Sequence, residues 1–287
     1  MFRLPRVRVE LFGAHLPTRR GPLFGLAAFA LWAAAVRPAA AQLSVDKLEL
    51  SIERRTASPD VGAFTVTNET DSVIQGRVYL MDWSREEGGE LQFTPLGSVP
   101  QSCARYVKVF PLSVRLPAHA SQAIRVGLEG ADSLAAACWS IAFVEVENAG
   151  AGGGTGRRLT YNIRIGVKIY VIPPGLAKDG EVEEMAIVRA ATGAGRARVD
   201  TSHDHVTVAF RNSGGLPLAV TGRVEFRRID NSVAAHDTVQ SFPILPGARR
   251  RINVPLPALT SGHYIALVLL DFGGADVAAG QIPLDVP

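Results

Sequence analysis

The residues with the clearest capacity for chemistry are basic side chains on two expected strands. Arg54 and Arg55 lie in the segment LELSIERRTASPD (48–60), and Lys168 lies near the end of a long alternating segment. The first and last strands of a β-sandwich lie close together, so a cation from each could converge on one anion, for example a C-terminal carboxylate. The alternative is that all three are ordinary surface charges.

Residue patterns typical of catalysis or metal binding are missing from the sequence. There is no GxSxG, HExxH or Cys/His nucleophile arrangement, and the HDH triplet of His203 and His205 has no second cluster of ligands nearby. The glycine-rich segment GAGGGTG (150–156) leads into an expected strand, whereas a phosphate-binding loop leads into a helix. We therefore predict no catalytic residues, no metal, no cofactor and no enzymatic activity.

The N-terminus has the pattern of an export signal. Basic residues precede a 14-residue apolar run (23–36) that is too short to span a bilayer, and Ala39, Ala40 and Ala41 offer a cleavage site before Gln42. No later stretch has the length and apolarity of a membrane helix. We expect a signal peptide at 1–41 and a mature, periplasmic or secreted protein that does not span a membrane. Arg19 and Arg20 leave open whether export uses the general or the twin-arginine route.

The positive charge of the chain belongs mostly to this leader. The whole sequence has 30 Lys and Arg, 27 Asp and Glu and a formal net charge of +3, and the leader holds six arginines and one glutamate. Its removal leaves 24 basic and 26 acidic residues, a formal net charge of −2. The mature chain therefore gives no electrostatic argument for binding nucleic acid.

The sequence has two cysteines, Cys103 and Cys138, and both lie in the expected mature part. In an exported protein an isolated pair predicts one disulfide, because the compartment is oxidising. A metal site would need more ligands at closer spacing.

The segment 159–174, LTYNIRIGVKIYVIPP, is organised as one long strand. Apolar residues recur at every second position from Leu159 through Tyr161, Ile163 and Ile165 to Val171, and β-branched and aromatic types dominate. Such alternation places the odd positions on one face and Lys168 on the other. The strand is about twice the usual length, so we expect part of it to lie at a sheet edge or to extend past its sheet. Pro173 and Pro174 end it.

The mature chain reads as two copies of one strand pattern. Each half has an opening strand, a strand ending in Asn, a second strand, a strand–proline turn–strand segment, a central strand and a closing strand. About seven strands per half, with turns every 8–12 residues, are typical of an antiparallel immunoglobulin-like sandwich. We predict an all-β protein with two such domains after the signal peptide, at 42–174 and 180–287.

The N-terminal domain resembles the periplasmic chaperones of the chaperone–usher pilus pathway. The resemblance covers about 45–175, whereas the C-terminal domain resembles only a generic immunoglobulin-like domain. The matching pieces are an opening strand with a basic residue, FTVTN (64–68), a strand ending in Trp83, FPLSVRLPAHASQAIRV (110–126), CWSIAFVEVEN (138–148) and KIYVIP (168–173).

This resemblance implies a non-enzymatic chaperone that caps a pilin or fimbrial subunit by donating an edge strand, with an outer-membrane usher as a second partner. The family's carboxylate-binding cations fall on Arg55, with Arg54 as the alternative, and on Lys168. Its donor residues fall on Leu159, Tyr161 and Ile163, and the strand continues through Ile165. Two departures are that Ile172 stands where an arginine often precedes the proline, and that many members lack the cysteine pair. The competing interpretation is a structural or surface-adhesion protein of tandem immunoglobulin-like domains.

Overall fold

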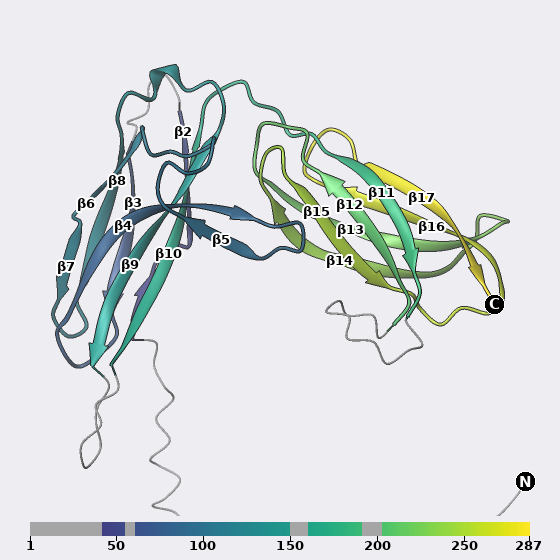
Figure 1. The fold of residues 1–287 in the computed structure, drawn as a ribbon, viewed down its shortest axis with the longest axis horizontal. Helices are drawn as coiled ribbons and strands as arrows, with labels where there is room; N and C mark the ends of the chain where they lie inside the picture. Colours follow the sequence, from purple (N-terminus) through teal and green to yellow (C-terminus); the bar gives the residue numbers. More distant parts are fainter. Residues whose placement is uncertain (1–41, 55–60, 150–159, 191–202) are drawn as a thin grey trace, which may run out of the picture. The chain divides into compact units, whose positions relative to one another are not determined.

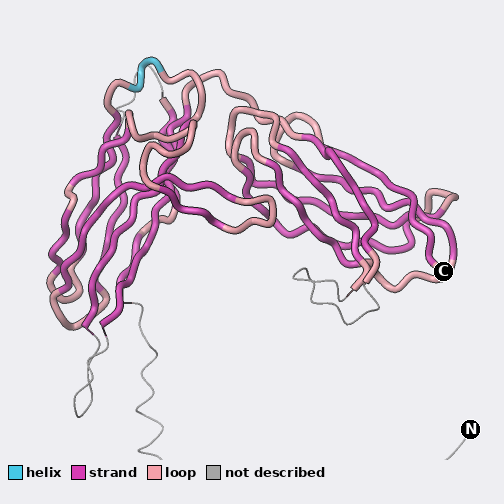
Figure 2. The backbone as a smooth tube through the Cα atoms, viewed as in Figure 1, coloured by secondary structure: helices cyan, strands magenta, loops and turns pink. Residues whose placement is uncertain are grey.

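The strands of this protein form two β-sandwiches that follow one another along the chain (Figure 1). The structure is a computed structural model, and it describes residues 42–54, 61–149, 160–190 and 203–287. Figure 2 shows that strands make up most of this part and that the helical content is one short 3-10 turn, Ala131–Ser133. The predicted fold class, all-β with two immunoglobulin-like sandwiches, is confirmed. The expected signal peptide, 1–41, lies outside the described residues.

The first sandwich consists of two sheets that face each other across a hydrophobic core. One sheet has the strand order β1-β3-β8-β6, and the other has the order β2-β10-β9-β4-β5, with β7 also pairing to β4. The strands are β1 (Leu43–Val45), β2 (Glu49–Glu53), β3 (Val61–Asn68), β4 (Ile74–Arg85), β5 (Leu91–Thr94), β6 (Val107–Phe110), β7 (Ser113–Leu116), β8 (Ser121–Leu128), β9 (Cys138–Ala149) and β10 (Thr160–Ile172).

The opening segment of the first half, expected as one strand, is divided between the two sheets. β1 pairs antiparallel with β3, and β2 pairs parallel with the end of β10. Between them, Asp46 is fixed to β3, because its amide donates to the Thr65 carbonyl (3.1 Å) and its carboxylate accepts the Thr65 amide (2.7 Å). The chain therefore crosses from one sheet to the other between β1 and β2.

The alternating apolar residues of the strands fill the space between the two sheets. Phe64, Val66, Ile124, Val144 and Ile169 are all fully buried there. The disulfide predicted between Cys103 and Cys138 is present and lies in the same core, with both cysteines buried. Burial of side chains of this size typically contributes about 1.5–3 kcal/mol each, so the core is the main source of the sandwich's stability.

Two strands of the first sandwich were not expected from the sequence. β5 pairs with the end of β4, and β6 pairs with β8 at the margin of the other sheet. Each is only four residues long. An alternating pattern over four residues contains two apolar positions at most, which does not distinguish a strand from a loop.

The second sandwich has seven strands in the described residues. Their orders are β11-β12-β15 and β14-β13-β16-β17. In β13, the buried carboxylate of Glu225 accepts hydrogen bonds from Arg223 (2.6 Å) and Arg227 (2.6 and 2.9 Å), and these bonds lower its pKa below the ordinary value. The strands are β11 (Glu181–Val188), β12 (His205–Arg211), β13 (Leu218–Arg228), β14 (Val233–Ile244), β15 (Arg249–Pro255), β16 (Gly262–Asp271) and β17 (Ala278–Val286).

Candidate functional site

The most unusual feature of the first sandwich is that β10 pairs with a neighbouring strand along nearly all of one edge but along only part of the other. β9 pairs with β10 from Thr160 to Val171, whereas β2 pairs with it only from Lys168 to Ile172. Within the described residues, no strand pairs with positions 160–167 on the β2 side. We call this stretch the open edge of β10.

Two hydrogen bonds identify which peptide groups lie along the open edge. The amide of Lys168 donates to the carbonyl of Leu48, and the amide of Arg54 donates to the carbonyl of Ile172, both at 2.9 Å. Even-numbered residues of β10 therefore direct their N–H and C=O groups toward β2. Since a strand alternates and the β9 register is continuous, Asn162, Arg164 and Gly166 present their peptide groups at the open edge.

The side chains at odd positions of β10 face the core of the first sandwich. Val167, Ile169 and Val171 are fully buried, whereas Ile163 and Ile165 are half-buried against the same core. Burial therefore decreases toward the end of the strand that carries the open edge. Of the predicted donor residues, Leu159 lies outside the described residues. Tyr161 is described only as part of the backbone of β10.

The even positions form a row of polar and aromatic contacts on the opposite face of the sheet. Arg164 lies over the Phe143 ring, with its guanidinium carbon 4.2 Å from the ring centroid, and the Asn162 amide donates to Glu145 (3.2 Å). The pKa of Glu145 is lowered, chiefly because Tyr79 donates a hydrogen bond to it. Positions 162 and 164 are thus held on one side by β9 and its neighbours while their peptide groups stay open on the other.

Lys168 lies where the open edge ends and the pairing with β2 begins. Its ammonium is 2.7 Å from a carboxylate oxygen of Glu49, the residue directly opposite it in β2. The same ammonium lies 5.3 Å from the centroid of the buried Trp83 ring. Lys168 is therefore held between an aromatic face and a carboxylate of its own chain.

Of the other predicted cations, the structure describes only Arg54 and places it away from Lys168. Arg55 lies outside the described residues. Arg54 follows β2, beyond the point where Glu53 pairs with Ile172, and its guanidinium contacts the Ala131 carbonyl and the Asp132 carboxylate (2.6 Å). Because a strand advances by about 3.3 Å per residue, the Arg54 backbone is roughly 16 Å along the sheet from the level of Glu49 and Lys168.

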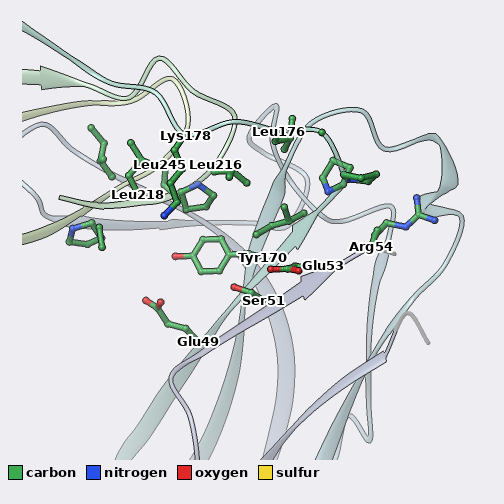
Figure 3. A pocket seen from close by; sticks show the side chains of 18 of the residues that line it. Glu49, Ser51, Glu53, Arg54, Tyr170, Leu176, Lys178, Leu216, Leu218 and Leu245 are labelled. Carbon is green, nitrogen blue, oxygen red and sulfur yellow. The ribbon is translucent and has the colours of Figure 1, made fainter. Parts of the chain in front are cut away.

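A cavity of about 560 Å³ borders β2 and the end of β10, with Glu49 and Tyr170 among its lining residues (Figure 3). Glu49 and the hydroxyl of Tyr170 point toward it, whereas the guanidinium of Arg54 points away from both. Burial raises the pKa of the Tyr170 phenol, so this group is a neutral hydrogen-bonding partner at physiological pH. The other residues that line the cavity include Ser51, Glu53, Trp83, Arg85, Leu176, Lys178, Leu216, Leu218 and Leu245.

Sequence reasoning did not identify Glu49 as part of this site. Its position in an alternating segment indicates only which face of the strand it shares with Ser51 and Glu53. Its position opposite Lys168 depends on the parallel register between two strands more than a hundred residues apart, which no local pattern encodes.

Other polar clusters of the described residues do not form a metal site. No group of three or more His, Cys, Asp or Glu side chains in this part of the chain is arranged to hold a metal ion. Of the HDH triplet, His205 begins β12 and its ring contacts the carbonyl of His203 (3.0 Å). A search for membrane spans in the same residues finds no helix of sufficient length and apolarity.

Comparison with known proteins gives structural likenesses at low sequence identity. No protein-family model matches the chain, and no curated protein matches it. Similar solved structures include a chaperone–tip adhesin complex of CFA/I fimbriae (14% identity, covering 86% of this chain and 100% of that chain, TM-score 0.48) and the class 5 fimbriae chaperone CfaA (15%, 85% and 99%, 0.46). Another is the CsuC–CsuE chaperone–tip adhesion subunit pre-assembly complex from Csu pili of Acinetobacter baumannii (9%, 84% and 98%, 0.46).

Proposed function

We propose that this protein is a non-enzymatic periplasmic chaperone that holds an extended segment of a pilus or fimbrial subunit against the open edge of β10. The observation that carries the proposal is the open edge itself, where the peptide groups of Asn162, Arg164 and Gly166 have no strand partner among the described residues. An incoming strand would form main-chain ladder bonds with these groups, and alternate side chains would give specificity.

The side chains of β10 support this use of the edge. Ile163 and Ile165 are half-buried, so they have apolar surface left to bury against a partner. Leu159 and Tyr161 continue the same parity in the sequence and would enter the partner's groove with Ile163. Burial of each such side chain contributes up to about 1.5–3 kcal/mol, less the free energy needed to order the partner.

We further propose that Lys168, together with Arg55, binds the terminal carboxylate of the captured subunit. Lys168 supports this role because it lies at the end of the open edge and beside the cavity-lining residues Glu49 and Tyr170. The sequence resemblance to pilus chaperones supports a pilus or fimbrial subunit as the class of partner and the periplasm as the location. An outer-membrane usher is a second partner that the same resemblance suggests.

Subunit capture in the periplasm tests the proposal. Tagged protein is recovered from the periplasm of cells that carry their own pilus genes, and bound subunits are identified by mass spectrometry. Lys168→Ala and Ile163→Asp should each lose the bound subunit while the variants remain folded. Thr160→Ser, a conservative change at an even position of β10, should leave capture unchanged.

The competing interpretation predicts a different result in the same experiment. If the protein is a structural or adhesive module of tandem immunoglobulin-like domains, no subunit accompanies the wild type. If a subunit does accompany it, retention by both Lys168→Ala and Ile163→Asp would show that the open edge is not the binding site.

A further inference from the structure

The two side chains of the Lys168–Glu49 ion pair differ in their exposure to solvent. The Lys168 side chain is only 19% exposed and is shielded by the Trp83 ring, whereas the Glu49 side chain is 54% exposed. The lysine is therefore the fixed member of the pair. The Glu49 side chain is already largely in water, so it can rotate away from the lysine into solvent.

A carboxylate that approaches Lys168 meets Glu49 already in place. Two carboxylates at one ammonium repel each other, so a second anion gains little while Glu49 keeps its contact. Glu49 is also attached to the neighbouring strand, which gives it a high effective concentration at the lysine. A free carboxylate in solution competes poorly with such a partner.

A strand on the open edge would deliver its own carboxylate under different conditions. The open edge and β2 lie along the same side of β10, and β2 begins at Glu49, so a strand that pairs with 160–167 must end or turn away at that residue. If it runs parallel to β10, its C-terminus arrives beside Lys168. Ladder bonds then hold the carboxylate in place and raise its effective concentration at the lysine, so that it competes with Glu49.

We infer that Glu49 is a resident counter-ion of Lys168, and that capture requires the partner's terminal carboxylate to displace it. The inference rests on the function proposed above and adds a specificity rule to it. A partner is held well only if it offers both a pairing strand and a chain end at the correct position. Glu49 thereby excludes anions that lack a strand.

The test compares two forms of one peptide on four versions of the mature protein. The probe is a short fluorescein-labelled peptide of alternating isoleucine and serine, made once with a free C-terminal carboxylate and once as the carboxamide. Its affinity is measured by fluorescence anisotropy for the wild type, Glu49→Gln, Glu53→Gln and the double variant Glu49→Gln with Lys168→Met. Glu53 is the matched control, because it lies on the same face of β2 but opposite Ile172.

Glu49→Gln should tighten binding of the carboxylate peptide about fivefold, the effect of removing one competing ion-pair partner, and should change binding of the carboxamide by less than about twofold. Glu53→Gln should change neither, and the gain should disappear in the double variant. If the peptides bind but Glu49→Gln affects both forms equally, or Glu53→Gln has the same effect, the inference is wrong and the proposed function stands. If neither peptide binds any version, the proposed function is wrong and the inference falls with it.

Discussion

The open edge of β10 can be tested by placing proline at neighbouring positions of opposite parity. Asn162 directs its N–H toward the open edge, and Ile163 directs its N–H toward β9. Proline has no N–H and is tolerated in a strand only where that group would face solvent. Asn162→Pro should therefore preserve the sandwich, and Ile163→Pro should disrupt it.

The expected magnitudes follow from the bonds that each proline removes. Asn162→Pro removes no ladder bond to β9 and one exposed side-chain hydrogen bond to Glu145, so the unfolding free energy should fall by less than about 1 kcal/mol. Ile163→Pro removes a ladder bond inside a paired sheet and a half-buried side chain, with an expected loss of about 3 kcal/mol or more. On the partner's side, Asn162→Pro removes one ladder bond and adds a ring at the contact, so capture should weaken at least about fivefold.

Urea unfolding and periplasmic capture are measured on both variants, with Asn162→Ala as the control for the lost amide side chain. Asn162→Ala should capture the subunit like the wild type, and Asn162→Pro should be folded but defective. Normal capture by a folded Asn162→Pro would refute the assignment of this edge as the binding edge. Unfolding of Asn162→Pro to the same extent as Ile163→Pro would show that position 162 is already paired within the chain.

Three further predictions concern stability. Replacing Cys103 and Cys138 by serine should lower the unfolding free energy by about 3–4 kcal/mol in urea titrations, since the bond closes a loop with a sequence separation of 35; an unchanged midpoint would contradict this. Gly166→Val should cost about 1–3 kcal/mol, because a Cβ at this position would lie 2.6 Å from the Ile141 Cδ1 atom, and thermal unfolding tests it against Gly127→Ala, where no atom lies within 4 Å. The lowered pKa of Glu225 means that its stabilisation is present above the ordinary value of 4.5 and is lost as the pH falls through the folded-state pKa. Glu225→Gln should therefore reduce stability at neutral pH and make the acid branch of the stability curve shallower; an acid branch identical to that of the wild type would rule this out.

Much of the fold could be predicted because long strands carry a strong local signal. The segment that forms β10 alternates over its whole length, and the apolar positions it predicts as buried, such as Val167 and Ile169, are fully buried. The pairing of the cysteines followed from their number and from the export signal. Short strands such as β5 carry too few residues for any period to be visible.

The candidate site was less accessible to sequence reasoning, because it depends on register. The alternation of β10 indicates that Lys168 lies on the face opposite Ile163, but it does not indicate what lies beside it on the next strand. Both Arg54 and Glu49 belong to the opening segment, and its alternation does not indicate which of its residues lies opposite Lys168. Only the register of the folded sheet places the acid at the lysine.

The crossing of the chain between β1 and β2 has a consequence for the size of any guest strand. Asp46 is bonded to Thr65 in one sheet, and two residues later the Leu48 carbonyl accepts the Lys168 amide in the other. The described open edge, residues 160–167, therefore spans about 26 Å, the length of eight extended residues. A change in the length of the chain between Asp46 and Leu48 could move the start of β2 along β10, and it would then change this span without any change in β10. The three-residue connection between β1 and β2 thus limits the length of β10 that is available to pair with a guest strand.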